Sequence, residues 1–294
     1  MKIMAAEYGF QGFIAAIARL VLNGNMITNY GKDLSGLTAL CDVLPALKNP
    51  ISLELANCNL KVAEVNELAR AMAAGAALTE VNVAFNQIGS DGGIALRDGL
   101  KTSNLKFLAI GKMYTSKGGT VITGSQLTTG VTLSAGGRLG ELIKGPDSDF
   151  DVKLRWADDG KESGWMKLHS LDGEPLKLPL QSPFEGEHLD LVHQKLDPGH
   201  IVILAWWLTT EFIGAIASLN CSQNDAITGK RSRDNDGCGP WIYGEQLEGW
   251  TALCSSLSGT SITSLNFSGC ELKPEALTPL ADAIKFMGAL TSIN

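Results

Sequence analysis

Three alternating aspartates are the residues whose spacing comes closest to that of a metal site. Asp147, Asp149 and Asp151 follow the D-x-D-x-D order that opens a calcium-binding loop. Such a loop also needs glycine at its sixth place and glutamate at its twelfth, where this chain has Val152 and Asp158. No helical pattern flanks the segment. We therefore interpret the aspartates as an acidic turn before a strand and expect no metal there.

Histidine and glycine patterns give no complete catalytic or cofactor site. The histidines form neither H-E-x-x-H nor H-x-H, and each is interpreted as a surface residue. Gly229-Lys230 could end a phosphate-binding loop, but Arg231 follows where Ser or Thr is needed. Because no nucleophile and base can be identified together, we expect no enzyme, no cofactor and no metal. The four histidines are His169, His188, His193 and His200.

The cysteines favour buried thiols over metal ligands or disulfides. None forms a C-x-x-C pair, and most fall on places that the repeat pattern below assigns to the interior. Reduced, buried thiols are typical of intracellular proteins, so we expect a cytoplasmic location. The six are Cys41, Cys58, Cys221, Cys238, Cys254 and Cys270.

Composition argues against nucleic-acid and membrane functions. The 294 residues carry a formal charge of -7, and the densest basic group, Lys230 to Arg233, continues into Asp234 and Asp236. We interpret that group as a solvated loop and expect no nucleic-acid partner. The start of the chain lacks the layout of a secretory signal. The longest apolar run, Ile201 to Leu208, is too short to span a bilayer and is predicted to be a buried strand.

The segment from Leu78 to Ile88 supplies the element around which the chain is organised. It reads Leu-Thr-Glu-Val-Asn-Val-Ala-Phe-Asn-Gln-Ile, which matches the repeat L-x-x-L-x-L-x-x-N-x-L. Alternation across Val81, Asn82 and Val83 predicts a strand with one buried face. Asn86, at the ninth place, is expected to turn inward and bond backbone groups left unpaired where the strand ends.

The pattern recurs with a period of about 28 residues, which leaves room for one helix in each unit. Asn25 and Cys58 take the ninth places of the two units before Asn86, and Leu105 begins a fourth unit. Apolar stripes at helical spacing follow the predicted strands, as at Val65, Leu68 and Met72. No unit buries its apolar face alone, so the repeats must stack.

This pattern resembles the leucine-rich repeats of the ribonuclease-inhibitor type, which also occur in NOD-like receptors. The resemblance covers residues 14 to 112 and about 212 to 294. It implies a curved solenoid, with parallel strands on the concave side and helices on the convex side, that holds other proteins.

Periodicity stops after Ile110, and short alternating segments separated by Gly-Pro and Asp-Asp-Gly turns follow. They predict a small antiparallel barrel or meander. The string GPDSDxDVKxRWxDDGxESGW is similar to an SH3-like module of algal and protist proteins. Trp156 and Trp165 could line a peptide pocket in such a module. We favour a place in the barrel core and keep both as candidate binding residues. The proline-rich stretch from Pro175 to Pro198 is predicted to be an irregular connector.

The last third of the chain repeats the first. Tyr30 to Cys41 aligns without a gap on Tyr243 to Cys254, and the stretch from Ala5 resembles that from Thr209. A loop between Asn224 and Tyr243 is predicted to be a flexible insert. The sequence ends after two apolar strand positions of a new repeat. Because an uncapped end of a solenoid exposes its core, we expect that the protein is longer or that a partner binds at this end.

The predicted fold is therefore an α/β leucine-rich-repeat solenoid in two blocks, 1–112 and 201–294, with an SH3-like insert and connector at 113–200. The predicted function is a non-catalytic scaffold for a protein partner. The alternatives are a stabilising subunit of a large multiprotein assembly, and a regulatory fragment of a protein whose catalysis lies elsewhere. The candidate partner-binding residues are Arg19, Glu54, Glu80, Asn82, Phe85, Phe107, Trp156 and Trp165.

Overall fold

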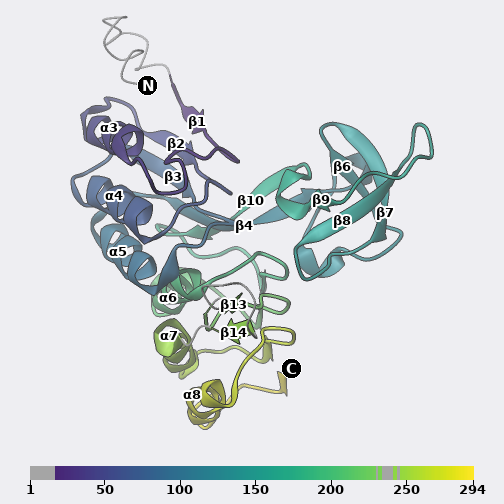
Figure 1. Cartoon of the computed structure of the whole chain (residues 1–294). Coiled ribbons are helices and arrows are strands. Elements are labelled where there is room, and N and C mark those ends of the chain that lie inside the picture. The colour runs from purple at the N-terminus through teal and green to yellow at the C-terminus, as the bar shows by residue number, and fades with distance from the viewer. Residues whose placement is uncertain (1–16, 230, 234–240, 244–245) are drawn as a thin grey trace, which may run out of the picture.

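A computed structural model describes residues 17–229, 231–233, 241–243 and 246–294 (Figure 1). The alignment that begins at Ala5 therefore starts outside the described residues. Lys230 of the basic group and Cys238 also lie outside them. The other five cysteines are buried and free.

The first part of the chain alternates parallel strands with helices, as the repeat pattern predicts. The strands are β1 (Arg19–Val21), β2 (Ile51–Glu54), β3 (Leu78–Asn82) and β4 (Phe107–Thr115), each paired in parallel with the next. The helices are α3 (Ser35–Val43), α4 (Val62–Ala73) and α5 (Gly89–Thr102), with a 3-10 turn at Leu44–Ala46. Leu53, Val81 and Leu108 stand in register and are 0% exposed. Residues at the fourth position of successive repeats therefore stack in one row inside the core.

Asn86 closes the turn after β3, and its predicted role is confirmed. Its side chain is buried, and its Oδ1 accepts from the backbone N–H groups of Cys58 (3.0 Å) and Leu60 (2.9 Å). Its Nδ2 donates to the carbonyls of Leu55 and Val83, both at 2.9 Å. One side chain therefore satisfies backbone groups of two consecutive repeats.

Asn224 has the same role in the second block. It is 0% exposed, its Oδ1 accepts from the Leu196 N–H, and its Nδ2 donates to the carbonyls of Leu191 and Cys221. Asn25 differs, because it follows the edge strand β1 and is exposed.

The insert folds around a core of its own. Strands β6 (Thr132–Ala135), β7 (Arg138–Lys144), β8 (Asp151–Trp156) and β9 (Met166–Lys167) form one antiparallel row, and β5 (Val121–Ile122) pairs with the end of β4. Short 3-10 turns occur at Lys117–Gly119, Gly124–Gln126 and Leu168–Ser170. Leu133, Leu142, Val152 and Leu154 are 0% exposed between these strands. The pairings show a meander, and closure into a barrel stays a proposal.

The predicted irregular connector contains two strands, so that interpretation was wrong. β10 (Gly173–Pro179) pairs antiparallel with β4, and β11 (His188–Asp190) opens a second sheet. β10 tolerates Pro175 and Pro179 because it is the edge strand of its sheet, where an N–H can be missing.

The second sheet is parallel, in the order β11, β12 (Ser218–Asn220), β15 (Ser264–Asn266) and β16 (Ser292–Ile293). Its helices are α6 (Pro198–Trp207), α7 (Leu247–Leu257) and α8 (Pro274–Ile284), with a 3-10 turn at Glu211–Ile213. In the expected loop after Asn224, β13 (Arg231–Arg233) pairs antiparallel with β14 (Trp241–Tyr243).

The strand predicted at Ile201 to Leu208 is wrong, because this run lies in α6. Asp197 caps the helix by accepting from the N–H groups of Gly199 and His200, and Pro198 suits the first turn. The helix is apolar all round because other helices cover it on two sides. α6 has 10 residues, and no helix within the described ranges is long and apolar enough to cross a membrane.

The structure also reveals a repeat that the sequence reading missed. Leu189, Leu191 and Leu196 take the places of Val81, Val83 and Ile88, and Gln194 takes the ninth place. Gln194 accepts from the Lys112 N–H and donates to the Lys112 carbonyl. The Gln194 side chain, which is longer than the asparagine at this position in other repeats, therefore joins this repeat to β4, which precedes the insert in the sequence.

The helices form one column on the opposite side from the strands (Figure 1). Each of α3 to α8 contacts the next, including α5 and α6, which flank the insert in the sequence. A Cβ on Gly93 would lie 2.4 Å from the Gly199 carbonyl oxygen, so glycine is required at this close approach. The Gly89 N–H, at the start of α5, also donates a hydrogen bond to Asp197 Oδ2. A single apolar core includes residues of both blocks, from Leu37 to Met287.

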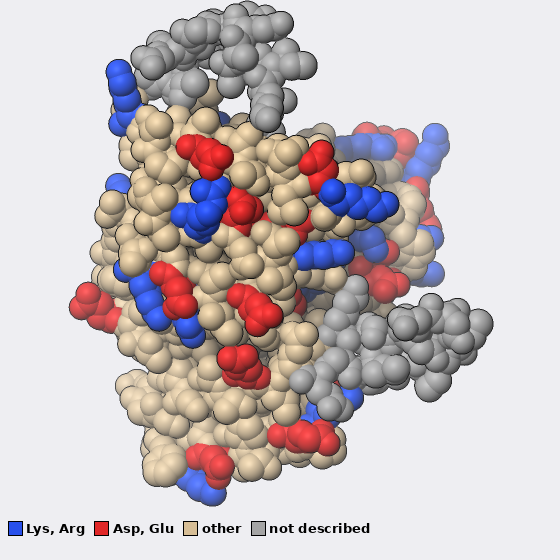
Figure 2. All heavy atoms as spheres, turned by 60° about the vertical axis from the view of Figure 1, so that its left-hand side comes forward, with Lys and Arg blue, Asp and Glu red and all other residues tan. Residues whose placement is uncertain are grey.

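Charges on the helix side are interspersed rather than separated. Figure 2 shows basic side chains next to acidic ones over this face. Arg70, for example, pairs with Asp42 and Glu67 at 2.8 Å each. Arg70 and Asp42 are exposed and Glu67 is partly exposed, so solvent screens both pairs and they contribute little to stability.

Candidate binding cavity between the strand face and the insert

One side of the strands faces the helices. The other side faces away from the helices and is here called the open face. Alternation within each strand puts Arg19, Glu54, Glu80, Asn82 and Phe107 on the open face, because their neighbours Leu20, Leu53, Val81 and Leu108 belong to the core or pack against it.

The polar residues of the open face bond to one another. Arg19 donates to Glu54 Oε1 from Nε (3.3 Å) and Nη2 (3.1 Å). Asn82 Nδ2 donates to Glu54 Oε2 at 2.7 Å, and the Asn82 Oδ1 accepts from the Ala84 N–H. Glu54 is 2% exposed, so its charge is buried and both its oxygens are occupied. Beside this group, Lys177 pairs with Glu80 at 2.7 Å.

Residues just before the ninth places share a left-handed backbone. The angle φ is +53° at Asn57 and +58° at Phe85, and Gly24, Gln223 and Gly269 also have positive φ. Glycine and asparagine adopt this conformation readily, whereas a bulky aromatic residue rarely does. The repeat turn thus fixes the direction of the Phe85 side chain at an energetic cost.

The side chains of Asn57 and Phe85 both meet His169 of the insert. Asn57 Nδ2 lies 2.9 Å from His169 Nε2, and the Phe85 and His169 ring centroids are 6.0 Å apart. Lys112, from β4, donates its Nζ to the backbone carbonyls of His169 and Leu171. These contacts attach the insert to the repeats, and they leave Phe85 only 4% exposed.

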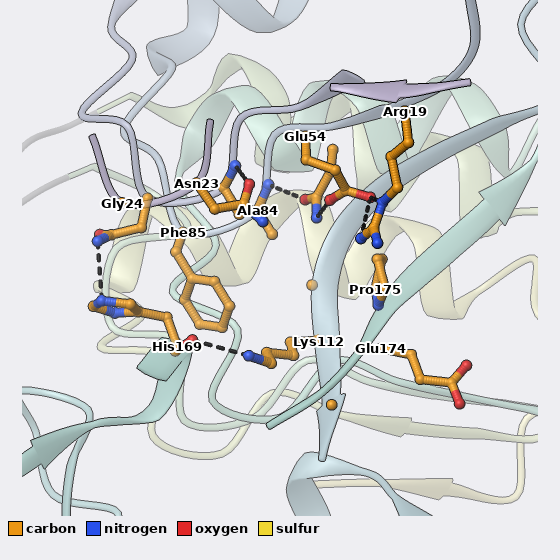
Figure 3. Close-up of a pocket in the computed structure, with 15 residues that line it drawn as sticks. Arg19, Asn23, Gly24, Glu54, Ala84, Phe85, Lys112, His169, Glu174 and Pro175 are labelled. Atoms are coloured by element: carbon orange, nitrogen blue, oxygen red, sulfur yellow. Dashed lines mark hydrogen bonds and ion pairs between the residues drawn. The ribbon is translucent and has the colours of Figure 1, made fainter. Parts of the chain in front are cut away.

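A cavity of about 210 Å³ remains between the open face and the insert (Figure 3). It exists because small residues occupy strand and turn positions where larger side chains would fill the space: Gly24, Ala56, Ala84, Gly111 and Gly173. The larger residues that line it are Arg19, Asn23, Glu54, Asn57, Asn82, Phe85, Lys112, His169, Glu174 and Pro175.

Burial and neighbouring lysines control the charges at one end of the cavity. Burial lowers the pKa of His169 to about 4, and the positive charges of Lys195, Lys112 and Lys167 add to this effect. His169 is therefore neutral at pH 7. Burial also lowers the pKa of Lys112, while the nearby charge of Asp172 opposes that shift.

The structure brings together four of the eight predicted binding residues. Arg19, Glu54, Asn82 and Phe85 line the cavity. Glu80 and Phe107 lie beside it without lining it. Glu80 is buried, and Phe107 is partly buried with the Lys177 ammonium 5.6 Å from its ring.

Both tryptophans of the insert lie outside the cavity lining. Trp156 packs against the insert core with the Arg138 guanidinium 4.4 Å from its ring. Trp165 is 51% exposed, with the Lys153 ammonium 5.2 Å from its ring, so its predicted place in the core of the insert was wrong. Lys112 and His169 are lining residues that the sequence reading did not select, and no local pattern marked either one.

The acidic triplet forms a backbone turn. The Asp147 Oδ1 accepts from the N–H groups of Asp149 and Asp151, and Asp151 begins β8 and pairs with Lys167 at 2.9 Å. Over the described ranges, no group of three His, Cys, Asp or Glu residues is arranged to hold a metal.

Comparison with known families supports the repeat interpretation. A model of the leucine-rich repeat matches residues 77–96 and 260–281. The first match covers β3 and the start of α5, and the second covers β15 and the start of α8. The chain therefore contains leucine-rich repeats, a class of structure that generally mediates protein–protein interaction. A search of the curated proteins finds no match to this chain.

Proposed function

We propose that this chain is a non-catalytic, cytoplasmic scaffold that holds a protein partner through its open face. In this proposal the repeats are of the ribonuclease-inhibitor type and curve into a solenoid, and the insert is an SH3-like module. The observation that carries it is the cavity between the open face and the insert, because that position lets a partner contact both at once.

The size of the cavity favours a protein side chain over a cofactor. Sites for drug-sized ligands and cofactors typically have volumes of about 300–1,000 Å³. A volume of about 210 Å³ suits one anchoring side chain, with the rest of a partner spread over the surrounding face.

Filling the cavity tests this function. Ala56 lies on its wall and is partly exposed, so Ala56→Tyr should fill the space without removing any bond described above. We expect the variant to lose at least about tenfold in affinity for a partner captured by the unmodified protein from native lysate. The matched control is Ser268→Tyr, an exposed position at the same repeat place on the second sheet. Unchanged capture by the Ala56 variant would refute the cavity as the binding site.

A role as a stabilising subunit of a large assembly is the second candidate. It is favoured by apolar side chains around α8 and β16: Leu277, Ile284, Phe286 and Ile293 are 55%, 36%, 70% and 40% exposed. Co-purification at fixed stoichiometry in high salt, abolished by Phe286→Asp, would support this role over transient binding. Survival of the complex in that variant would oppose it.

A further inference from the structure

Lys112 places a positive charge on the cavity wall without a carboxylate partner. Its Nζ donates to two backbone carbonyls, those of His169 and Leu171. An ammonium group has three N–H donors, so one is left over. Among the described residues, no carboxylate oxygen lies within 4 Å of it.

Two further side chains have donors left over. Arg19 uses only Nε and Nη2 on Glu54, and its side chain is 58% exposed. Asn23 Oδ1 accepts a hydrogen bond from the Ala56 N–H at 2.7 Å. This bond fixes the orientation of the Asn23 amide, so its Nδ2 points away from Ala56. Arginine has five N–H donors and no acceptor, so the remaining capacity on this wall is for donation.

The two carboxylates of the cavity lining are already occupied or turned away. Glu54 is bonded through Oε1 to Arg19 and through Oε2 to Asn82. Figure 3 shows the Glu174 carboxylate pointing away from the space that Phe85, Lys112 and Arg19 surround. Arg19 and Glu54 form an ion pair, and the Glu174 carboxylate points outward, so Lys112 is the lysine of the lining whose ammonium faces no carboxylate within 4 Å among the described residues. The lining therefore suits a ligand that is negatively charged and accepts hydrogen bonds.

We propose that the cavity takes up one carboxylate side chain of a protein partner, an Asp or a Glu, with Lys112 and Arg19 as its counter-charges. The inference rests on the proposed protein-binding function and names the chemistry of the anchor. Lys195 and Lys167 also lie near His169, although Lys167 pairs with Asp151 at 2.9 Å. The partner segment is thus acidic, although the chain itself has a net charge of -7.

The test uses the complete chain and two small probes of nearly identical shape, N-acetyl-glutamate N-methylamide and N-acetyl-glutamine N-methylamide. Binding is followed by NMR through the backbone amides of Gly24, Gly111 and Gly173, which line the cavity. We expect saturable shifts with the glutamate probe, and affinity at least about tenfold lower with the glutamine probe. Equal responses to the two probes would overturn the proposal. So would a phosphoserine probe that binds about tenfold more tightly than the glutamate probe, which would point to a phosphoryl ligand.

Two variants connect the response to the named charges. Lys112→Met should abolish the glutamate-dependent shifts, and Arg19→Gln, at a half-exposed position less able to disturb the fold, should weaken them at least about threefold. The matched control is Lys106→Gln, which removes an exposed lysine outside the lining. Full binding in both the Lys112 and Arg19 variants would overturn the assignment.

Failure of this inference can be distinguished from failure of the proposed function. If Ala56→Tyr abolishes partner capture but no carboxylate probe binds, the scaffold function stands and the carboxylate anchor is wrong. If the probe binds through Lys112 but cavity filling leaves partner capture unchanged, the anion site stands and the proposed protein-binding site is wrong.

Discussion

Asn86 and Asn25 occupy the same repeat place but differ in their surroundings. Asn86 is buried and bonds to backbone groups of two repeats, whereas the Asn25 amide donates to Leu22 and Asn23 at the surface. Removal of a buried partner leaves several backbone groups unsatisfied, and each costs about 1–3 kcal/mol.

We therefore predict that Asn86→Ala lowers the free energy of unfolding by about 3 kcal/mol or more, while Asn25→Ala changes it by about 1 kcal/mol or less. Urea denaturation at equilibrium measures both. Similar losses in the two variants would mean that the ninth-place amide acts through local turn geometry and not through burial.

The lowered pKa of His169 predicts a pH-dependent attachment of the insert. Because the folded state favours the neutral ring, the contribution of His169 is fully present above pH 6.5 and is lost as the pH falls toward 4. The groups around it are Lys112, Lys167 and Lys195, which oppose protonation, and Asp151, which favours it.

We expect hydrogen exchange at Leu168 and Leu171, corrected for intrinsic rates, to speed up between pH 7 and pH 4.5. The His169→Gln variant should lack this change, since glutamine does not titrate in that range. The same pH dependence in the variant would assign the effect to another group.

At the level of elements, the contact between α5 and α6 joins the two blocks. Gly93 and Gly199 let the helices approach so closely that a methyl group on Gly93 would overlap backbone. We predict that Gly93→Ala lowers the free energy of unfolding by about 1–3 kcal/mol, as overpacking of a core does.

Gly36 in α3 is the matched control, since a Cβ there meets nothing within 4 Å. Gly36→Ala should be neutral or stabilise by up to about 1 kcal/mol, because alanine favours a helix more than glycine does. Thermal unfolding followed by circular dichroism compares the pair. A harmless Gly93→Ala would show that the two helices lie further apart than described.

At the level of the whole molecule, the repeats share one apolar core and the insert has another. Leu204 of α6 belongs to the first core, and Leu154 of β8 belongs to the second. We predict that Leu204→Ala speeds hydrogen exchange in both repeat blocks, because each repeat is stabilised by its neighbours. Leu154→Ala should act mainly within the insert, with each change costing about 2–5 kcal/mol locally. Uniform effects of both variants would indicate a single cooperative unit.

The sequence by itself determined which residues occupy the apolar and ninth positions of the repeats in each block. Their apolar spacing and the ninth-place amides fix local strands, turns and buried faces, since these depend on neighbours a few residues apart. The positions of Leu53, Val81 and Asn86 followed directly. Residues 201–208 did not, because an apolar run without periodicity is compatible with a buried helix as well as a buried strand.

Only the tertiary structure decided where the insert lies and what surrounds the cavity. Asn57 and His169 are separated by 112 residues, and Lys112 lies on yet another strand. No short-range spacing relates such residues. Phe85 was predicted to bind a partner, but it is 4% exposed and contacts His169. Whether an outward side chain meets solvent or another part of the chain depends on contacts between distant segments, which the sequence pattern does not reveal.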